Sequence, residues 1–196
     1  MGATVTAVIL AGGRGERMGG VDKGLQALRG RSLVEWVLEV IEPQVDELVI
    51  TANRNLVRYL EFGYPVLQDR IRDFAGPLAG LHAGLTEARS QLTIAVPCDI
   101  PLLPADLVSR LLTALQRADA EAAVARTGQR PHSAICLCKT SLVHRLAEFI
   151  QNGGRKVADW HATLNLVYVD FDEQPGQFRN INTLEELRDV ESFVRC

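Results

Sequence analysis

Lysine, cysteine and long apolar runs are scarce in this chain of 196 residues. The net charge is -3, so no overall positive field draws the chain to nucleic acid or to an acidic membrane. No apolar stretch reaches the roughly 18 residues of a membrane span. The apolar run at residues 5–11 lacks a basic flank and leads into glycines, which favours a buried strand over a signal peptide. An anionic ligand must therefore be held by local groups.

The four cysteines form no disulfide framework and no C-x-x-C motif: they are Cys98, Cys136, Cys138 and Cys196. Cys136 and Cys138 share one face of an expected strand and could act as two metal ligands. The sequence around them offers no further thiol or histidine, which favours small buried core residues instead. We expect reduced thiols and a cytoplasmic protein.

Apolar strands alternate with amphipathic helices along the chain. Strands are expected at residues 5–11, 47–53, 64–69, 92–96, 121–126, 133–137 and 164–171. Helices are expected after the capping boxes that begin at Ser32 and Thr183, from Gly76-Pro77 and Pro104, and around residues 55–61 and 142–150. This βα order predicts a single three-layer α/β/α domain over residues 1–196, with a Rossmann-like, mostly parallel sheet.

Polar residues and glycines follow the expected strands in turn: Gly12-Gly13, then Asn53, Asp69 and Asp99. Open α/β sheets bind ligands at the carboxyl ends of their strands. A glycine loop, an amide and two carboxylates at one edge predict a site for a phosphorylated ligand and a divalent cation. Asn53 could contact a base or ribose, or satisfy the loop backbone.

Residues 12–20 hold five glycines and two arginines. Such a loop lets consecutive N–H groups surround phosphates, although a flexible turn is the simpler alternative. The dinucleotide fingerprint fails because Met18 stands where its last glycine belongs. A P-loop fails because Val21-Asp22 replaces the required Lys and Ser/Thr. The loop is therefore neither of these two types.

Lys23 is one of only three lysines, against eighteen arginines. A compact ammonium can follow phosphate charge as it shifts during a reaction, whereas an isolated lysine is ordinarily a solvated surface residue. Asp99 is a natural magnesium ligand at a strand end, or an Asx turn before Pro101. Asp69 has the same two interpretations.

Several segments, in this order, match one known family: Leu10-Ala11-Gly12-Gly13-Arg14, Arg17-Met18-Gly19-Gly20, Asp22-Lys23-Gly24-Leu25, Ala52-Asn53-Arg54, Gln68-Asp69, Gly76-Pro77-Leu78-Ala79-Gly80, Pro97-Cys98-Asp99 and the segment from Asn180 to Leu187. Together they resemble the molybdenum cofactor guanylyltransferases, the MobA family. The resemblance implies transfer of GMP from magnesium-bound GTP to the terminal phosphate of molybdenum-molybdopterin. The products would be pyrophosphate and the molybdopterin guanine dinucleotide cofactor.

The resemblance also implies a role for each matching residue. The nucleotide side would comprise Leu10, Ala11, Gly12, Gly13, Lys23, Asn53, Asp69, Gly76, Pro77, Leu78 and Asp99, and the pterin side Arg17, Gly20, Asn180, Asn182 and Arg155, with Lys156 as a further candidate. Lys23, Asp99 and Arg17 would be catalytic, and Asp99 would carry magnesium. Such a reaction brings anions together and needs mainly charge neutralisation and alignment, which Mg²⁺, Lys23 and Arg17 supply locally.

One segment departs from the family pattern, because Pro131-His132-Ser133 stands where a His-Pro-Thr-like stretch is usual. His132 could line the pterin side or be structural. The expected partners are GTP and molybdenum-molybdopterin, with transient contacts to proteins of cofactor biosynthesis or molybdoenzyme maturation. We expect a monomer that binds neither nucleic acid nor membrane.

Two alternative functions stay open. A cytidylyl- or sugar-phosphate nucleotidyltransferase could share the fold, although related pterin cytidylyltransferases tend to have Leu-Ala-Ala-Gly where this chain has Leu10-Ala11-Gly12-Gly13. A non-catalytic nucleotide-binding or cofactor-delivery protein is the alternative from another class. Lys23 and Asp99 argue against it, since binding alone has less need of both.

Overall fold

The computed structural model describes residues 3–13, 21–69, 71, 76–173 and 175–193. Its main sheet has seven strands in the order β5-β4-β1-β6-β8-β7-β9. Their bounds are β1 Val5–Leu10, β4 Glu47–Thr51, β5 Val66–Leu67, β6 Leu92–Pro97, β7 Ala122–Thr127, β8 Arg130–Lys139 and β9 Leu166–Asp170. The strand β8 runs antiparallel to β6 and β7, and the other neighbours pair in parallel. The expected mostly parallel sheet is confirmed.

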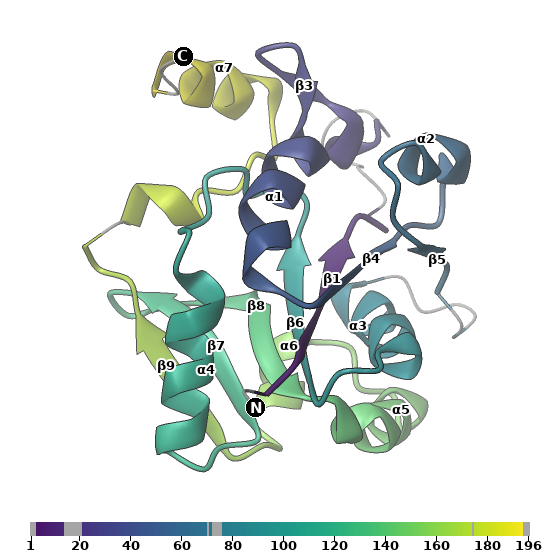
Figure 1. The fold of residues 1–196 in the computed structure, drawn as a ribbon, viewed down its shortest axis with the longest axis vertical. Helices are drawn as coiled ribbons and strands as arrows, with labels where there is room; N and C mark the ends of the chain where they lie inside the picture. The colour runs from purple at the N-terminus through teal and green to yellow at the C-terminus, as the bar shows by residue number, and fades with distance from the viewer. Residues whose placement is uncertain (1–2, 14–20, 70, 72–75, 174, 194–196) are drawn as a thin grey trace.

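Helices cover both faces of this sheet (Figure 1). They are α1 Leu33–Ile41, α2 Leu56–Leu60, α3 Pro77–Glu87, α4 Leu107–Arg117, α5 Val143–Gln151, α6 Val157–His161 and α7 Leu184–Phe193. Short 3₁₀ turns lie at Lys23–Leu25, Glu42–Gln44, Thr140–Leu142 and Pro175–Phe178. One core joins α1 and α4 to the sheet, and a second joins α3, α5 and α6 to its other face. The three-layer α/β/α architecture is therefore confirmed.

The strand β1 shows how alternation builds the two cores. Ala7 and Ile9 lie in the core with α1 and α4, because neighbouring side chains point to opposite faces. On the other face, Val8 lies against Gly84 of α3, where an added Cβ would be 2.3 Å from a Val8 methyl carbon. The missing side chain lets α3 approach the strand closely. A Cβ on Gly80, in the first turn of α3, would likewise lie 2.9 Å from Leu10, the last residue of β1, so this turn lies at the carboxyl ends of the strands.

Several element boundaries differ from the sequence predictions: β8, for example, spans Arg130–Lys139 instead of 133–137, and α6 was not predicted. The strand expected at residues 64–69 pairs only through Val66 and Leu67, because it is an edge strand that leaves Asp69 in the following loop. The helix expected from Pro104 begins instead at Leu107. Gln44 accepts the N–H of Val108 at 3.0 Å and so satisfies the first turn of α4. That contact spans 64 residues, so no local pattern could reveal it.

A small third cluster of buried hydrophobic residues lies apart from the main sheet. The strands β2 (Ala27–Leu28) and β3 (Arg31–Ser32) form a hairpin that the sequence did not predict. Its Leu28 is buried with Leu187 and Val190 of α7, and with Leu33 and Ile181. Figure 1 shows α7 (yellow) above α1, beside this hairpin. Packing in this cluster thus places α7 beside the segment that follows Lys23.

Both predicted capping boxes are present. The carboxylate of Glu35 accepts the N–H of Ser32 at 2.7 Å before α1. Glu186 accepts the N–H of Thr183 at 3.1 Å, and the Thr183 hydroxyl accepts the N–H of Glu186 at 3.1 Å before α7.

Within the described ranges, no helix is long and apolar enough to cross a membrane.

Candidate functional site

The ends of β4, β1 and β6 lie side by side, because these strands are neighbours and run in parallel. Gly12 follows β1, and a Cβ on it would be 3.0 Å from the side-chain nitrogen of Asn53, which follows β4. Asn53 also donates to Asp69 Oδ2 at 2.8 Å and accepts the N–H of Asp69 at 3.1 Å. The structure therefore brings together three of the polar and glycine positions predicted from the strand ends.

Lys23 and Asp99 meet in a second group at the same edge. The Lys23 ammonium lies 3.5 Å from Asp99 Oδ2 and donates to Asn182 Oδ1 at 2.8 Å. The side-chain amide of Asn180 donates to Asp99 Oδ1 at 3.4 Å. Residues predicted for the nucleotide side thus contact residues predicted for the pterin side. This contact joins parts of the chain separated by 159 residues.

Backbone hydrogen bonds fix this second group. The N–H of Ile181 donates to the carbonyl of Asp99 at 2.8 Å, and the Ile181 side chain is buried in the third cluster. The carboxylate of Glu186, in the first turn of α7, accepts the N–H of Asn182 at 2.6 Å. The start of α7 therefore holds Asn180 and Asn182 against the end of β6.

Burial shapes the electrostatics of the two carboxylates. Desolvation raises the pKa of Asp99 above its ordinary value, and the nearby Lys23 ammonium opposes that rise. Desolvation also raises the pKa of Asp69, while the hydrogen bond from Asn53 opposes it. The Asp99 carboxylate keeps an exposed fraction of 14%. A partly desolvated carboxylate of this kind gains free energy when a cation binds beside it.

Asp99 is a carboxylate at this edge that could hold a magnesium ion. No group of three or more His, Cys, Asp or Glu side chains that could hold a metal occurs in the described part of the chain. Mg²⁺ commonly binds through one or two carboxylates, with waters and substrate phosphates as its other ligands. The donor set here fits that kind of ion and does not fit a metal enclosed by protein ligands.

Some predicted site residues have structural tasks. The N–H of Ala11 already donates to the carbonyl of Thr51 at 2.8 Å. Leu78 is fully buried in the core around α3, and Leu10 packs against that core. Any contact of Leu78 with a ligand must therefore use its backbone. Pro77 is exposed, Gly76 is half-buried, and both begin α3 at this edge.

Two other predicted site residues have contacts of their own. Arg155 donates to the carbonyls of Ile150 and Gly154, at the end of α5. His132 stacks on Phe178 at a centroid distance of 4.7 Å and is hydrogen-bonded to Thr127 at 2.8 Å. These contacts suit a structural residue, and the place of His132 on the pterin side stays a prediction. Arg14, Arg17 and Gly20 lie outside the described residues.

Cys98, Cys136 and Cys138 are buried and free, in agreement with the core interpretation. Cys98 also helps to enclose Gly24, where an added Cβ would be 3.1 Å from its sulfur. Burial raises the pKa of the Cys98 thiol well above its ordinary value, and the carboxylates of Asp99 and Asp22 add to that rise. A neutral thiol therefore packs beneath the turn that carries Lys23.

The sequence reasoning missed a buried cluster behind Lys23. Asp22 is 9% exposed, and its carboxylate accepts hydrogen bonds from Tyr59 and Asn55. Arg54, beside Asn53, donates to the carbonyl of Gly13 at 3.2 Å and so links Gly13 to the end of β4. The position of Asp22 next to Lys23 in the sequence could have pointed to this cluster. Nothing in the sequence pointed to Tyr59, because its spacing resembles that of an ordinary core residue.

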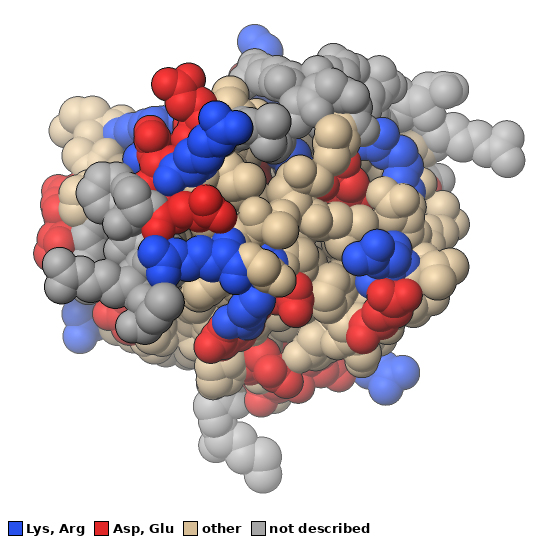
Figure 2. Space-filling view, turned by 90° about the horizontal axis from the view of Figure 1, so that it is seen from above, with Lys and Arg blue, Asp and Glu red and all other residues tan. Residues whose placement is uncertain are grey.

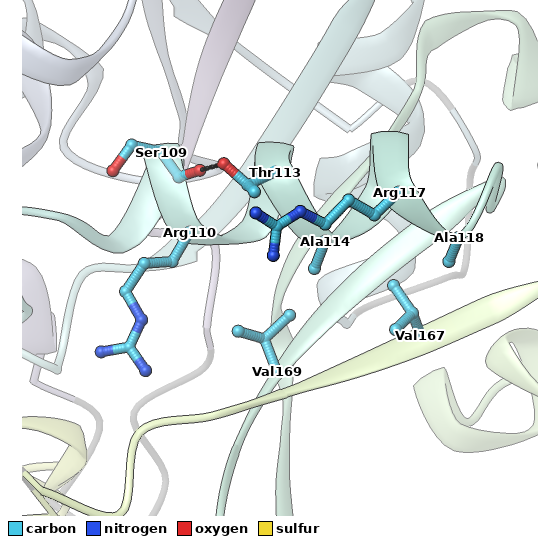
Figure 3. A pocket seen from close by; sticks show the side chains of 8 residues that line it. All are labelled: Ser109, Arg110, Thr113, Ala114, Arg117, Ala118, Val167 and Val169. Carbon is cyan, nitrogen blue, oxygen red and sulfur yellow. Dashed lines mark hydrogen bonds between the residues drawn. The ribbon is translucent and has the colours of Figure 1, made fainter.

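Figure 2 shows the face above the carboxyl ends of the strands. On its described part, basic and acidic side chains are interspersed, and no broad area of one sign is present. A hollow of about 570 Å³ lies instead between α4 and the edge strand β9 (Figure 3). It is lined by Arg110, Arg117, Val167 and Val169, among others. The strands β8 and β7 separate it from β6 and Asp99, so it is not part of the site.

Known proteins share this architecture and much of this sequence. The profile of the MobA-like NTP transferase domain matches residues 7–164. The chain belongs to the MobA-like NTP transferase family. A molybdenum cofactor guanylyltransferase of Methylibium petroleiphilum is 47% identical over 196 residues, which cover 96% of each chain. One from Shewanella sp. (strain MR-4) is 46% identical over 186 residues, or 95% of this chain and 94% of the relative.

Solved structures agree with this membership. The crystal structure of molybdopterin-guanine dinucleotide biosynthesis protein A from Archaeoglobus fulgidus superposes with a TM-score of 0.79. It is 26% identical and covers 97% of this chain and 98% of its own. A nucleotidyl transferase from Methanothermobacter thermautotroptrophicus, 20% identical with a TM-score of 0.77 over 98% of both chains, shares the fold. The MobA-like chain described here therefore has the fold of this class of nucleotidyltransferases.

Proposed function

We propose that this MobA-like transferase moves GMP from GTP to the terminal phosphate of molybdenum-molybdopterin, with release of pyrophosphate. The observation that carries the proposal is the contact of Lys23 with both Asp99 and Asn182. It supports a site in which triphosphate, metal and acceptor phosphate meet at one ammonium. The relatives named molybdenum cofactor guanylyltransferase, at about 46% identity over nearly the whole chain, support the choice of substrates.

The nucleotide lies, in this proposal, over the ends of β1 and β4. The exposed Gly13 and half-buried Gly12 leave the backbone open to the phosphates. The paired side chains of Asn53 and Asp69 offer a donor and acceptors to the base or ribose. Because each of these two side chains orients the other, the pair is preorganised for a polar ligand. The first turn of α3 lies beside the ends of these two strands, because a Cβ on Gly80 would lie 2.8 Å from the Thr51 hydroxyl and 2.9 Å from a Leu10 methyl carbon.

Asp99 is the residue proposed to hold Mg²⁺, together with triphosphate oxygens and water. When bound, the ion neutralises charge on the triphosphate. Lys23 supplies a second positive charge beside it. Asn182 accepts one N–H of the Lys23 ammonium and Asp99 Oδ2 accepts a second at 3.5 Å, so the third N–H stays available for a phosphate oxygen.

The reaction needs little acid–base chemistry from the protein. An oxygen of the acceptor's terminal phosphate attacks the α-phosphorus of GTP and forms a new P–O bond. The bond from that phosphorus to the bridging oxygen breaks, and pyrophosphate leaves with its electron pair. The protein aligns the two anions and offsets their repulsion. Asn180 and Asn182 are proposed to orient the acceptor, since both lie beside Asp99 and Lys23.

Nucleotide preference tests the proposed donor. We expect Mg²⁺ with GTP to raise the thermal unfolding midpoint more than Mg²⁺ with CTP or ATP at equal concentrations. A ligand that binds the native state stabilises it by about RT ln(1 + [L]/Kd), so the shift ranks the three affinities. GMP is a useful fourth ligand, because it keeps the base and lacks the outer phosphates. A larger shift with CTP than with GTP would favour the cytidylyltransferase alternative.

A further inference from the structure

Asp22 is a buried carboxylate beside Lys23, and two side chains satisfy it. The Tyr59 hydroxyl donates to Asp22 Oδ1 at 2.6 Å, and the Asn55 amide donates to Asp22 Oδ2 at 3.0 Å. Tyr59 has no exposed surface, and Asp22 retains only 9%. A carboxylate is expensive to bury unless it is fully hydrogen-bonded, so these bonds determine where residue 22 can lie.

Asn55 is placed unusually for this contact. It precedes α2 in a left-handed conformation with φ of 52°, which few residues other than glycine adopt. Its side chain does not cap α2. An asparagine at a helix start normally accepts an N–H of that helix. Here its amide reaches across to Asp22 instead, so the segment after β4 is arranged to hold the turn that contains Lys23.

The backbone on the other side of Lys23 is equally constrained. The side chain of Gln26 donates to the carbonyl of Asp22 at 3.2 Å, and the N–H of Gln26 donates to the carbonyl of Lys23 at 3.0 Å. A Cβ on Gly24 would lie 2.5 Å from the Tyr59 hydroxyl. Tyr59 therefore contacts both residues that flank Lys23. The Lys23 side chain extends from the turn that these contacts hold, and its ammonium reaches Asp99.

We infer that Tyr59 and Asn55 are positioning residues for Lys23, which they fix through the Asp22 carboxylate. Both oxygens of Asp22 are already occupied, so its part is to anchor the turn. The inference rests on the proposed function, because it takes Lys23 as the group that binds the outer phosphates of a nucleoside triphosphate. A purely structural cluster would stabilise the fold without favouring triphosphate over monophosphate.

The affinity ratio of GTP to GMP distinguishes the two roles. Tyr59→Phe keeps the buried ring and removes the hydroxyl. We expect it to lower the GTP-to-GMP affinity ratio, measured by calorimetry with Mg²⁺, about tenfold, since charge-assisted bonds from Lys23 to the outer phosphates are weakened. GMP affinity should change less than about twofold, because GMP lacks those phosphates. Tyr64→Phe is the matched control: burial and the neighbouring Glu42 carboxylate raise the pKa of the Tyr64 hydroxyl, and Glu42 lies just past the end of α1.

A double-mutant cycle then shows whether Tyr59 acts through Lys23. In a Lys23→Ala background, Tyr59→Phe should leave the GTP-to-GMP ratio unchanged. An unchanged ratio in the Lys23 background, or an equal fall in both backgrounds, would overturn the inference. Should Tyr59→Phe not fold, Asn55→Gly carries the same prediction, because glycine tolerates the φ of 52°. Absence of GMP transfer by the unaltered protein would reject the proposed function and leave this ratio measurable.

Discussion

Lys23→Ala is expected to lower the rate of GMP transfer at least about 100-fold, the scale seen when one group that stabilises a charged transition state is removed. The Lys23 ammonium lies 3.5 Å from Asp99 and 2.8 Å from Asn182, so in the proposed site it is the cation shared by donor and acceptor. Pyrophosphate release at saturating GTP and cofactor measures the effect. Lys23→Arg should recover little, because a planar guanidinium cannot occupy the position of the compact ammonium.

Lys139→Ala is the matched control for this variant. Lys139 pairs with Leu92 at the start of β6, at the opposite end of that strand from Asp99. Its ion pair with Asp119 is long, at 3.9 Å, and exposed. Such pairs contribute roughly 0–1 kcal/mol, so stability and turnover should hardly change. Equal losses in the two variants would mean that Lys23 has no special part in the reaction.

Asp99→Asn is expected to have the second large effect, again a loss of turnover of at least about 100-fold. The substitution keeps the shape of the side chain and removes the charge proposed to hold magnesium. It should also raise the Mg²⁺ concentration that gives half-maximal activity. The folded state should not suffer, because burial already disfavours the charged form of Asp99, as its raised pKa indicates. Magnesium titrations of activity and thermal unfolding together test both statements.

Asp46→Asn is the matched control for Asp99. Asp46 precedes β4, and its carboxylate accepts the N–H of Val5 at 2.7 Å, at the start of β1. The substitution therefore removes one carboxylate charge at the opposite end of the same sheet. We expect unaltered magnesium dependence in this variant. A normal magnesium response in Asp99→Asn would contradict the assignment of the metal to Asp99.

Local patterns in the sequence predicted most of the fold. The nearly continuous apolar run of β1 and the capping boxes at Ser32 and Thr183 depend on neighbours in the sequence, and the structure contains all three. The sequence predictions failed where contacts between distant parts of the chain determine the structure. Gln44 satisfies the start of α4, and a hairpin of only two residues per strand is stabilised by α7 rather than by its own sequence.

The candidate site divides in the same way. Strand ends can be recognised from the amino-acid pattern, so Gly12, Asn53 and Asp99 are predictable from the sequence alone. The cluster that anchors Lys23 is not, since Tyr59 and Asp22 are 37 residues apart and a buried tyrosine looks like a core residue in sequence. The contact of Asn182 with Lys23 likewise depends on the path of the chain through α7.

One reaction tests the central claim most directly. The purified protein is incubated with GTP labelled at the α-phosphate, Mg²⁺ and molybdenum-molybdopterin, and the products are separated. The proposed function predicts that label enters the pterin cofactor as GMP, with one pyrophosphate released per cofactor, and that CTP does not replace GTP. Label that stays in GTP while the cofactor is bound would contradict guanylyl transfer and favour a delivery protein.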